Sequence, residues 1–156
     1  MTSRTKWTII ISAAVLIIAG AVALFIYEHN SIKVFMRSEY VKEVVLQKTS
    51  FDGLMDQYLD QVRTYNGSSE SAAKVQGLAN RLYSFVAALQ SNLGPRVPAV
   101  SRDHYNAMIA AYQTYLDAVN LYQQAVSQNL GDQRTALMNQ ADAKMTDAQN
   151  AMNNLP

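Results

Sequence analysis

Histidine is the side chain best suited to acid-base and metal chemistry near neutral pH, and the sequence contains only two. His29 and His104 each stand directly beside an acidic residue. Adjacent positions on a helix point about 100° apart, so neither pair can hold a metal as Glu-x-x-His or His-x-x-x-His does. We therefore interpret both as surface histidines and predict no di-iron or zinc site.

A row of carboxylates, Asp52, Asp56 and Asp60, follows one helical face at a spacing of four residues. Such a row could hold a divalent cation or supply an acid/base pair. It lies on the outer side of an apolar stripe, where like charges repel, so we interpret it as a solvated face. Serine occurs without a matching histidine and carboxylate, and no glycine-rich phosphate loop is present. The sequence predicts no catalytic, cofactor or metal residues, and an enzyme ranks third among the possible functions.

Tyrosines form the most distinctive chemical group. Six of the nine fall on the apolar faces of two predicted helices: Tyr58, Tyr65, Tyr105, Tyr112, Tyr115 and Tyr122. A buried hydroxyl needs a hydrogen-bond partner, so a tyrosine-rich core is costlier than a leucine-rich one. One interpretation is a pocket for a small aromatic or amphipathic ligand, lined by Tyr58, Tyr112 and Tyr115. The other is an ordinary core whose tyrosine hydroxyls reach its rim.

Four amphipathic segments must position these side chains. Apolar residues recur in steps of three and four over residues 31–66, 72–94, 101–130 and 133–155. Turn residues such as Asn66-Gly67 and Gly94-Pro95 separate the segments. Loops of about two to seven residues favour antiparallel neighbours. We expect an all-α fold in which residues 49–156 form an antiparallel up-down four-helix bundle.

The first of these segments is the longest, and it contains a weak point. Within Lys48-Thr49-Ser50, either Thr49 or Ser50 could cap the start of a new helix. Gly53, a few residues later, lowers the helix propensity of the segment. At 1.5 Å per residue the segment exceeds its shortest neighbours by about 20 Å. We therefore predict a membrane-proximal helical stalk over residues 28–48.

An uncharged run of 21 residues extends from Trp7 to Tyr27. As a helix it spans about 31 Å, close to the thickness of a bilayer core, with an aromatic ring at each end. Arg4 and Lys6 precede it, which predicts a cytoplasmic segment 1–6, a transmembrane signal anchor 7–27 and an extracytoplasmic bundle. A cleaved signal peptide ending near Ala23 is the alternative, but the apolar run continues to full membrane length.

The composition narrows the possible functions further. Without cysteine the chain has no disulfide, thiolate metal site or cysteine nucleophile. After the predicted anchor, 11 basic residues nearly balance 12 acidic ones, and no basic stripe indicates nucleic acid. Asn66-Gly67-Ser68 matches the N-glycosylation pattern, so Asn66 is a possible acceptor in an exposed turn.

A local resemblance supports the same architecture. Residues 115–126 read Tyr-Leu-Asp-Ala-Val-Asn-Leu-Tyr-Gln-Gln-Ala-Val. This segment resembles the late helix Tyr-x-Asp-Ala-Val-x-x-Tyr-x-x-Ala-Val of LemA-type membrane proteins. The resemblance covers about a dozen residues and implies one N-terminal membrane helix followed by an antiparallel helical bundle. It implies no activity.

Together these features predict a single-pass protein of the cell membrane with the lipid bilayer and another protein as partners. Its bundle would act in protein interaction or envelope structure, without catalysis. The leading alternative is a small-ligand sensor with a tyrosine-lined pocket that signals through a partner.

Overall fold

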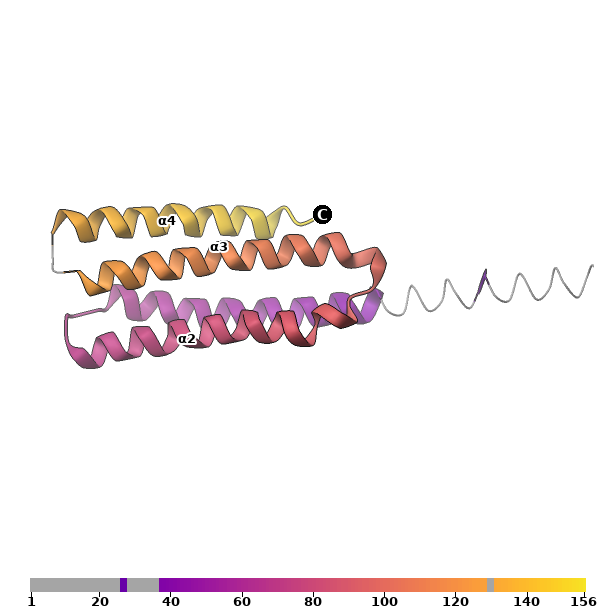
Figure 1. The fold of residues 1–156 in the computed structure, drawn as a ribbon, viewed down its shortest axis with the longest axis horizontal. Helices are drawn as coiled ribbons and strands as arrows, with labels where there is room; N and C mark the ends of the chain where they lie inside the picture. Colours follow the sequence, from indigo (N-terminus) through magenta and orange to yellow (C-terminus); the bar gives the residue numbers. More distant parts are fainter. Residues whose placement is uncertain (1–25, 28–36, 129–130) are drawn as a thin grey trace, which may run out of the picture. The chain divides into compact units, whose positions relative to one another are not determined.

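Antiparallel helices form a bundle in the second part of the chain. The computed structural model describes residues 26–27, 37–128 and 131–156. Within these ranges there are helices and no strands: a helix over residues 37–63, α2 (Ser69–Asn92), α3 (Arg102–Ser127) and α4 (Asp132–Asn153), with the short 3-10 turns η1 (Gly94–Arg96) and η2 (Ala99–Ser101). Successive helices run in alternating directions (Figure 1). The prediction of an all-α four-helix bundle is confirmed.

The chain divides into two compact units, Met1–Glu39 and Tyr40–Pro156, and the second contains the bundle. Apart from Ile26 and Tyr27, the predicted anchor from Trp7 to Tyr27 lies outside the described residues. Among the residues that are described, no helix combines the length and the apolar character needed to cross a membrane.

The start of α2 shows how local capping sets a helix boundary. Gly67 adopts a φ of +84°, which favours glycine, and turns the chain out of the 37–63 helix. The Ser68 hydroxyl then accepts a hydrogen bond from the Ser71 backbone N–H at 3.1 Å. Helix α2 therefore begins at Ser69, three residues before the predicted start at Ala72.

The 37–63 helix is continuous, which contradicts the predicted break near Lys48. The Thr49 and Ser50 hydroxyls donate to the backbone carbonyls of Val45 and Leu46, each at 3.0 Å. Hydrogen bonds to the carbonyl four residues earlier are compatible with a continuous helix, so these side chains do not cap a new one.

The predicted stalk over residues 28–48 is also shorter than expected at its bundle end. Tyr40 is 5% exposed and belongs to the core, and Val44 packs against that core. The Tyr40 hydroxyl lies 2.9 Å from His104 Nδ1 on α3. Residues 40–48 therefore belong to the bundle, and residues 28–36 lie outside the described ranges.

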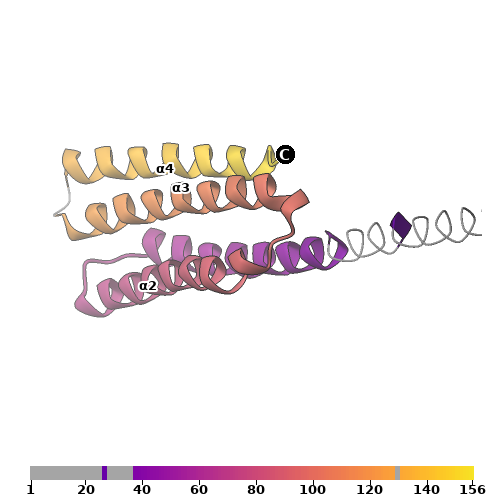
Figure 2. The same ribbon diagram turned by 45° about the vertical axis from the view of Figure 1, so that its right-hand side comes forward.

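Helices α3 and α4 pack most closely among the three labelled helices, side by side in Figures 1 and 2. Small buried residues recur every seven positions on both helices: Ala111, Ala118 and Ala125 on α3, and Ala141 and Ala148 on α4. A side chain as small as alanine lets two backbones approach closely. The pair α3–α4 thus forms one side of the bundle, with the 37–63 helix and α2 on the other (Figure 2).

An aromatic cluster joins these two sides. The ring of Phe51 lies 4.4 Å from that of Tyr112, 5.3 Å from Tyr115 and 5.6 Å from Phe85, measured between ring centroids. Each such pair contributes about 0.5–1.5 kcal/mol beyond its buried area. This cluster fixes Tyr112 and Tyr115, two of the three predicted pocket residues.

Candidate functional site

Three of the six buried tyrosines, Tyr40, Tyr58 and Tyr122, have hydrogen-bond partners inside the bundle. The Tyr58 hydroxyl donates to the Val119 carbonyl at 3.0 Å, and the Tyr122 hydroxyl donates to Asp142 Oδ1 at 2.5 Å. Burial, followed by neighbouring Tyr83 and Tyr122, raises the pKa of Tyr58 above its usual range. Burial also raises the pKa of Tyr122, reinforced by its bond to Asp142. These tyrosines act as structural cross-links.

Tyr112 differs from Tyr58 and Tyr122. It has no exposed surface, and its hydroxyl is buried without a hydrogen-bond partner in the described structure. Burial raises the pKa of Tyr112 above its usual range, and the negative charge of Asp52 raises it further. The sequence could not identify this hydroxyl as different from that of Tyr58, since both tyrosines occupy equivalent places on apolar stripes.

Tyr115 lines an open groove between the 37–63 helix, α3 and α4, which we call the α4 groove. Its volume is about 350 Å³. The inner wall consists of buried and partly buried residues: Met55, Leu59, Tyr115, Met145 and Met152. The rim is polar: Lys48, Asp52, Asp56, Gln149 and Asn153.

The three predicted pocket tyrosines therefore have different surroundings. Tyr115 lines the α4 groove, whereas Tyr58 and Tyr112 have no exposed surface. Tyr112 and Tyr115 both pack against Phe51, whereas Tyr58 packs against Tyr122 at a centroid distance of 6.2 Å. Of the three tyrosines, Tyr115 alone lines the α4 groove, where it lies among Met55, Met145 and Met152.

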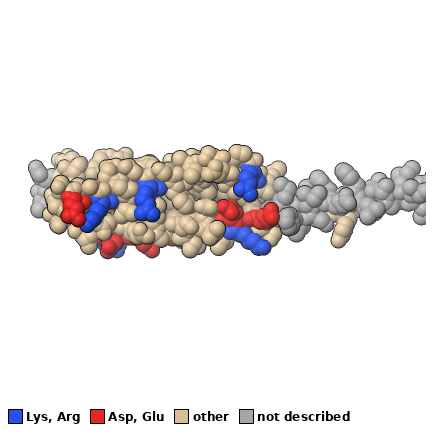
Figure 3. All heavy atoms as spheres, turned by 90° about the horizontal axis from the view of Figure 1, so that it is seen from below, with Lys and Arg blue, Asp and Glu red and all other residues tan. Residues whose placement is uncertain are grey.

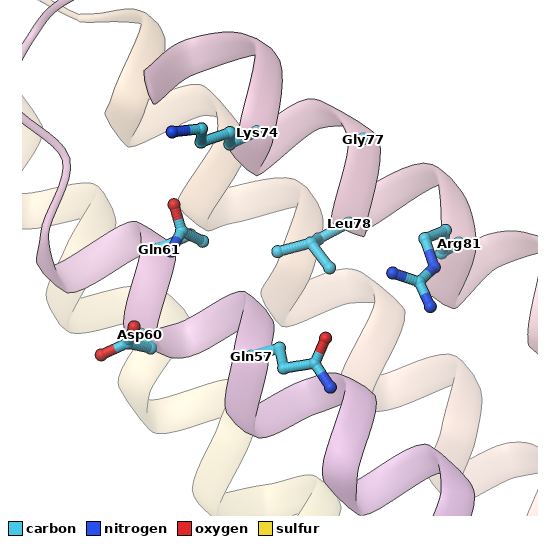
Figure 4. A pocket seen from close by; sticks show the side chains of 7 residues that line it. All are labelled: Gln57, Asp60, Gln61, Lys74, Gly77, Leu78 and Arg81. Carbon is cyan, nitrogen blue, oxygen red and sulfur yellow. The ribbon is translucent and has the colours of Figure 1, made fainter. Parts of the chain in front are cut away.

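A second groove, the α2 groove, lies between the 37–63 helix and α2 and has a volume of about 410 Å³. It is lined by Gln57, Asp60, Gln61, Lys74, Gly77, Leu78 and Arg81. Figure 4 shows Leu78 pointing into the space between the two helices, with the amides of Gln57 and Gln61 extending from the opposite side. The lining therefore combines one apolar side chain with amides and charges of both signs.

Gly77 gives the α2 groove part of its shape. Glycine within a helix costs about 0.5–1 kcal/mol relative to alanine. A Cβ atom added at Gly77 would meet nothing within 4 Å, so packing within the bundle does not require glycine there. The missing side chain instead leaves open space on the surface of α2.

The face of the bundle over the 37–63 helix and α2 carries few charges, and Figure 3 shows them scattered across an otherwise uncharged surface. Between Arg81 and Arg96 the sequence has no charged residue. The exposed positions in this stretch are mostly small or uncharged: Tyr83, Ser84, Ala87, Ala88, Gln90, Ser91, Asn92 and Pro95. We call this stretch, residues 82–95, the uncharged strip.

Within the described residues, the acidic row and His104 do not gather into a metal centre, and His29 lies outside those residues. Asp52 accepts a salt bridge from Lys48 at 2.6 Å, whereas Asp56 lines the α4 groove and Asp60 lines the α2 groove. Across the described ranges, no three His, Cys, Asp or Glu residues gather closely enough to hold a metal ion. His104 lies at the N-terminal end of α3 and is hydrogen-bonded to Tyr40, a pairing across 64 residues that no local sequence pattern indicates.

Asn66 occupies an exposed turn, as predicted. Its side-chain oxygen accepts hydrogen bonds from the Ser68 backbone N–H at 3.0 Å and from the Ser71 hydroxyl at 2.8 Å. The residue thus helps to shape the turn before α2. Its glycosylation stays a prediction.

Comparison with models of known protein families, with curated protein sequences and with solved structures finds no match to this chain. The segment that resembles LemA-type proteins lies on α3, and six of its matching residues are buried: Tyr115, Ala118, Val119, Tyr122, Ala125 and Val126. The matching pattern is therefore one of helix packing rather than of a surface site.

Proposed function

We propose that this chain is a single-pass membrane protein whose extracytoplasmic bundle binds another protein, or contributes to envelope structure, without catalysing a reaction. Its N-terminus is cytoplasmic, and residues 7–27 hold it in the bilayer. The uncharged length of that segment, its terminal Trp7 and Tyr27, and the preceding Arg4 and Lys6 support this topology. The resemblance to LemA-type proteins supports the same arrangement of anchor and bundle.

The surface over the 37–63 helix and α2 is the main support for protein binding. It combines the opening at Gly77 with the uncharged strip. A further hollow of about 200 Å³ lies along the same two helices, between Glu43 and Gln47 on one side and Ala88 and Asn92 on the other. The centres of protein interfaces are depleted in charge and need close surface complementarity. A helix or loop of a partner can approach α2 closely where side chains are small or absent.

Site-specific photo-crosslinking in native membranes tests this face. We expect a photoreactive residue at Ala88 to give a discrete crosslinked product, because Ala88 lies on the uncharged strip. The matched control is Ala143, an alanine that is also exposed but lies on α4. Gly77→Leu should suppress the Ala88 product while leaving the helical content unchanged, since nothing in the bundle lies within 4 Å of the added Cβ. Equal products from both positions, or none from either, would refute this interface.

Protease treatment tests the topology independently. Protease added outside intact cells, after permeabilisation of any outer barrier, should digest the bundle and leave a short fragment that contains the segment 7–27. Protection of residues after Tyr27 would show that the proposed orientation is reversed. Release of the undigested bundle in soluble form would favour cleavage of a signal peptide.

A further inference from the structure

The α4 groove has the features of a small-molecule site, and it lies on a different side of the 37–63 helix from the α2 groove. Its volume of about 350 Å³ falls in the range of ligand pockets. Three thioether side chains line it: Met55 from the 37–63 helix, and Met145 and Met152 from α4. Methionine is flexible and polarisable, and it makes favourable contacts with aromatic rings. These three side chains form the apolar wall of an otherwise polar groove, against which a compact apolar or aromatic body can lie.

Tyr115 supplies a polar group to the same wall. The residue is 7% exposed, and its hydroxyl makes no hydrogen bond within the described residues. Among the described residues the Tyr112 hydroxyl is the one fully buried side-chain polar group without a partner, so the unpaired Tyr115 hydroxyl keeps accessible surface at the groove, where water or a ligand can bind it. Burial raises the pKa of Tyr115, and the negative charge of Asp52 raises it further, so Asp52 acts on this hydroxyl.

The net charge on the rim determines whether the groove attracts a cation or an anion. Lys48 is paired with Asp52 at 2.6 Å, and these two charges largely cancel. Asp56 also lies on the rim, and neither of the two ion pairs among the described residues includes it. The groove therefore carries a net negative charge beside its apolar wall, which attracts a cation and repels an anion.

We infer that the α4 groove binds a small organic cation, in which an ammonium group is attached to an aromatic or branched apolar body. The body lies against Met55, Met145 and Met152. The ammonium group pairs with the Asp56 carboxylate and donates a hydrogen bond to the Tyr115 hydroxyl. This inference is independent of the proposed protein-binding face, because none of these residues lines the α2 groove.

Titration of the whole chain in neutral detergent micelles tests the inference, with the methionine methyl groups observed by NMR. The probe is phenethylammonium, and phenylpropionate is an anion of similar size and shape. We expect saturable shifts at Met55, Met145 and Met152 with the cation and at least tenfold weaker binding of the anion. Met108 is fully buried and does not line the groove, so its methyl signal serves as an internal reference.

Three variants separate charge from nonspecific partitioning into the micelle. Asp56→Asn should weaken binding of phenethylammonium about five- to tenfold, because it removes the rim charge. Asp60→Asn removes an equal charge one helical turn further along and outside the groove, so it should change binding less than twofold. Tyr115→Phe should weaken binding about two- to fivefold through loss of the hydroxyl.

Two results would overturn the inference. One is the absence of saturable shifts at the three groove methionines with phenethylammonium. The other is binding that is equally strong for phenylpropionate or unchanged by Asp56→Asn. Selective binding of the cation that Asp56→Asn weakens and Asp60→Asn does not would support it.

Discussion

The substitution of tyrosine by phenylalanine should have opposite effects at Tyr58 and Tyr112. Both residues are fully buried, and the substitution removes one oxygen atom from each while keeping the ring. The Tyr58 hydroxyl donates to the Val119 carbonyl at 3.0 Å, so Tyr58→Phe loses a hydrogen bond with a net value of about 1 kcal/mol. The Tyr112 hydroxyl has no partner in the described structure, and burying an unpaired polar group costs about 1–3 kcal/mol. Tyr112→Phe should therefore stabilise the bundle by about 1 kcal/mol.

The difference between the two variants is then about 2 kcal/mol, or about a thirtyfold change in the ratio of folded to unfolded protein. Urea unfolding of the whole chain in non-ionic detergent measures it, with helix content followed by far-ultraviolet circular dichroism. The dependence of the unfolding free energy on urea concentration should be the same for both variants and the wild type, because each retains the same buried surface.

An equal loss of stability in both variants would refute this reasoning. It would mean that the Tyr112 hydroxyl has a hydrogen-bond partner, such as a buried water molecule, whose loss costs as much as the bond from Tyr58. A change in ring packing would not explain such a loss, because phenylalanine at position 112 keeps the ring and its 4.4 Å contact with Phe51.

Four further predictions concern stability. Burial raises the pKa of Tyr40 to about 12, so this side chain ionises more readily in the unfolded chain. The contribution of this pKa shift to the free energy of unfolding is complete below about pH 10 and is lost as the pH rises through about 12. Urea midpoints measured across that pH range would show the loss. Tyr40→Phe should destabilise the bundle by about 1 kcal/mol by removing the bond to His104, whereas a residue of a separate stalk would have no effect on the urea midpoint. Gly77→Ala should raise the thermal midpoint by about 2–5 °C, since no atom opposes the added Cβ. Gly94→Ala should lower it, because its Cβ would lie 2.8 Å from the Tyr105 hydroxyl, and calorimetry on the pair compares the two signs directly.

Features that depend on neighbouring residues in the chain could be predicted from the sequence. The four helices follow from apolar residues repeated in steps of three and four, because each helix must bury one face. The turns follow from Asn66-Gly67 and Gly94-Pro95, whose backbone preferences are local. Even here, the Ser68 cap placed the start of α2 three residues before the apolar pattern indicated.

The extent of the bundle and the nature of its grooves required the tertiary structure. Whether Tyr40 belongs to a stalk or to the core depends on His104, which lies 64 residues further along the chain. Periodicity places Tyr58, Tyr112 and Tyr115 on apolar faces, but it does not specify which atoms of another helix lie opposite each hydroxyl. Periodicity likewise does not predict that Asp56 lines a groove, because the other side of that groove is formed by Met145 and Met152 of α4. Helical periodicity determines which face of each helix is buried, whereas hydrogen-bond partners and grooves arise only when separate helices pack together.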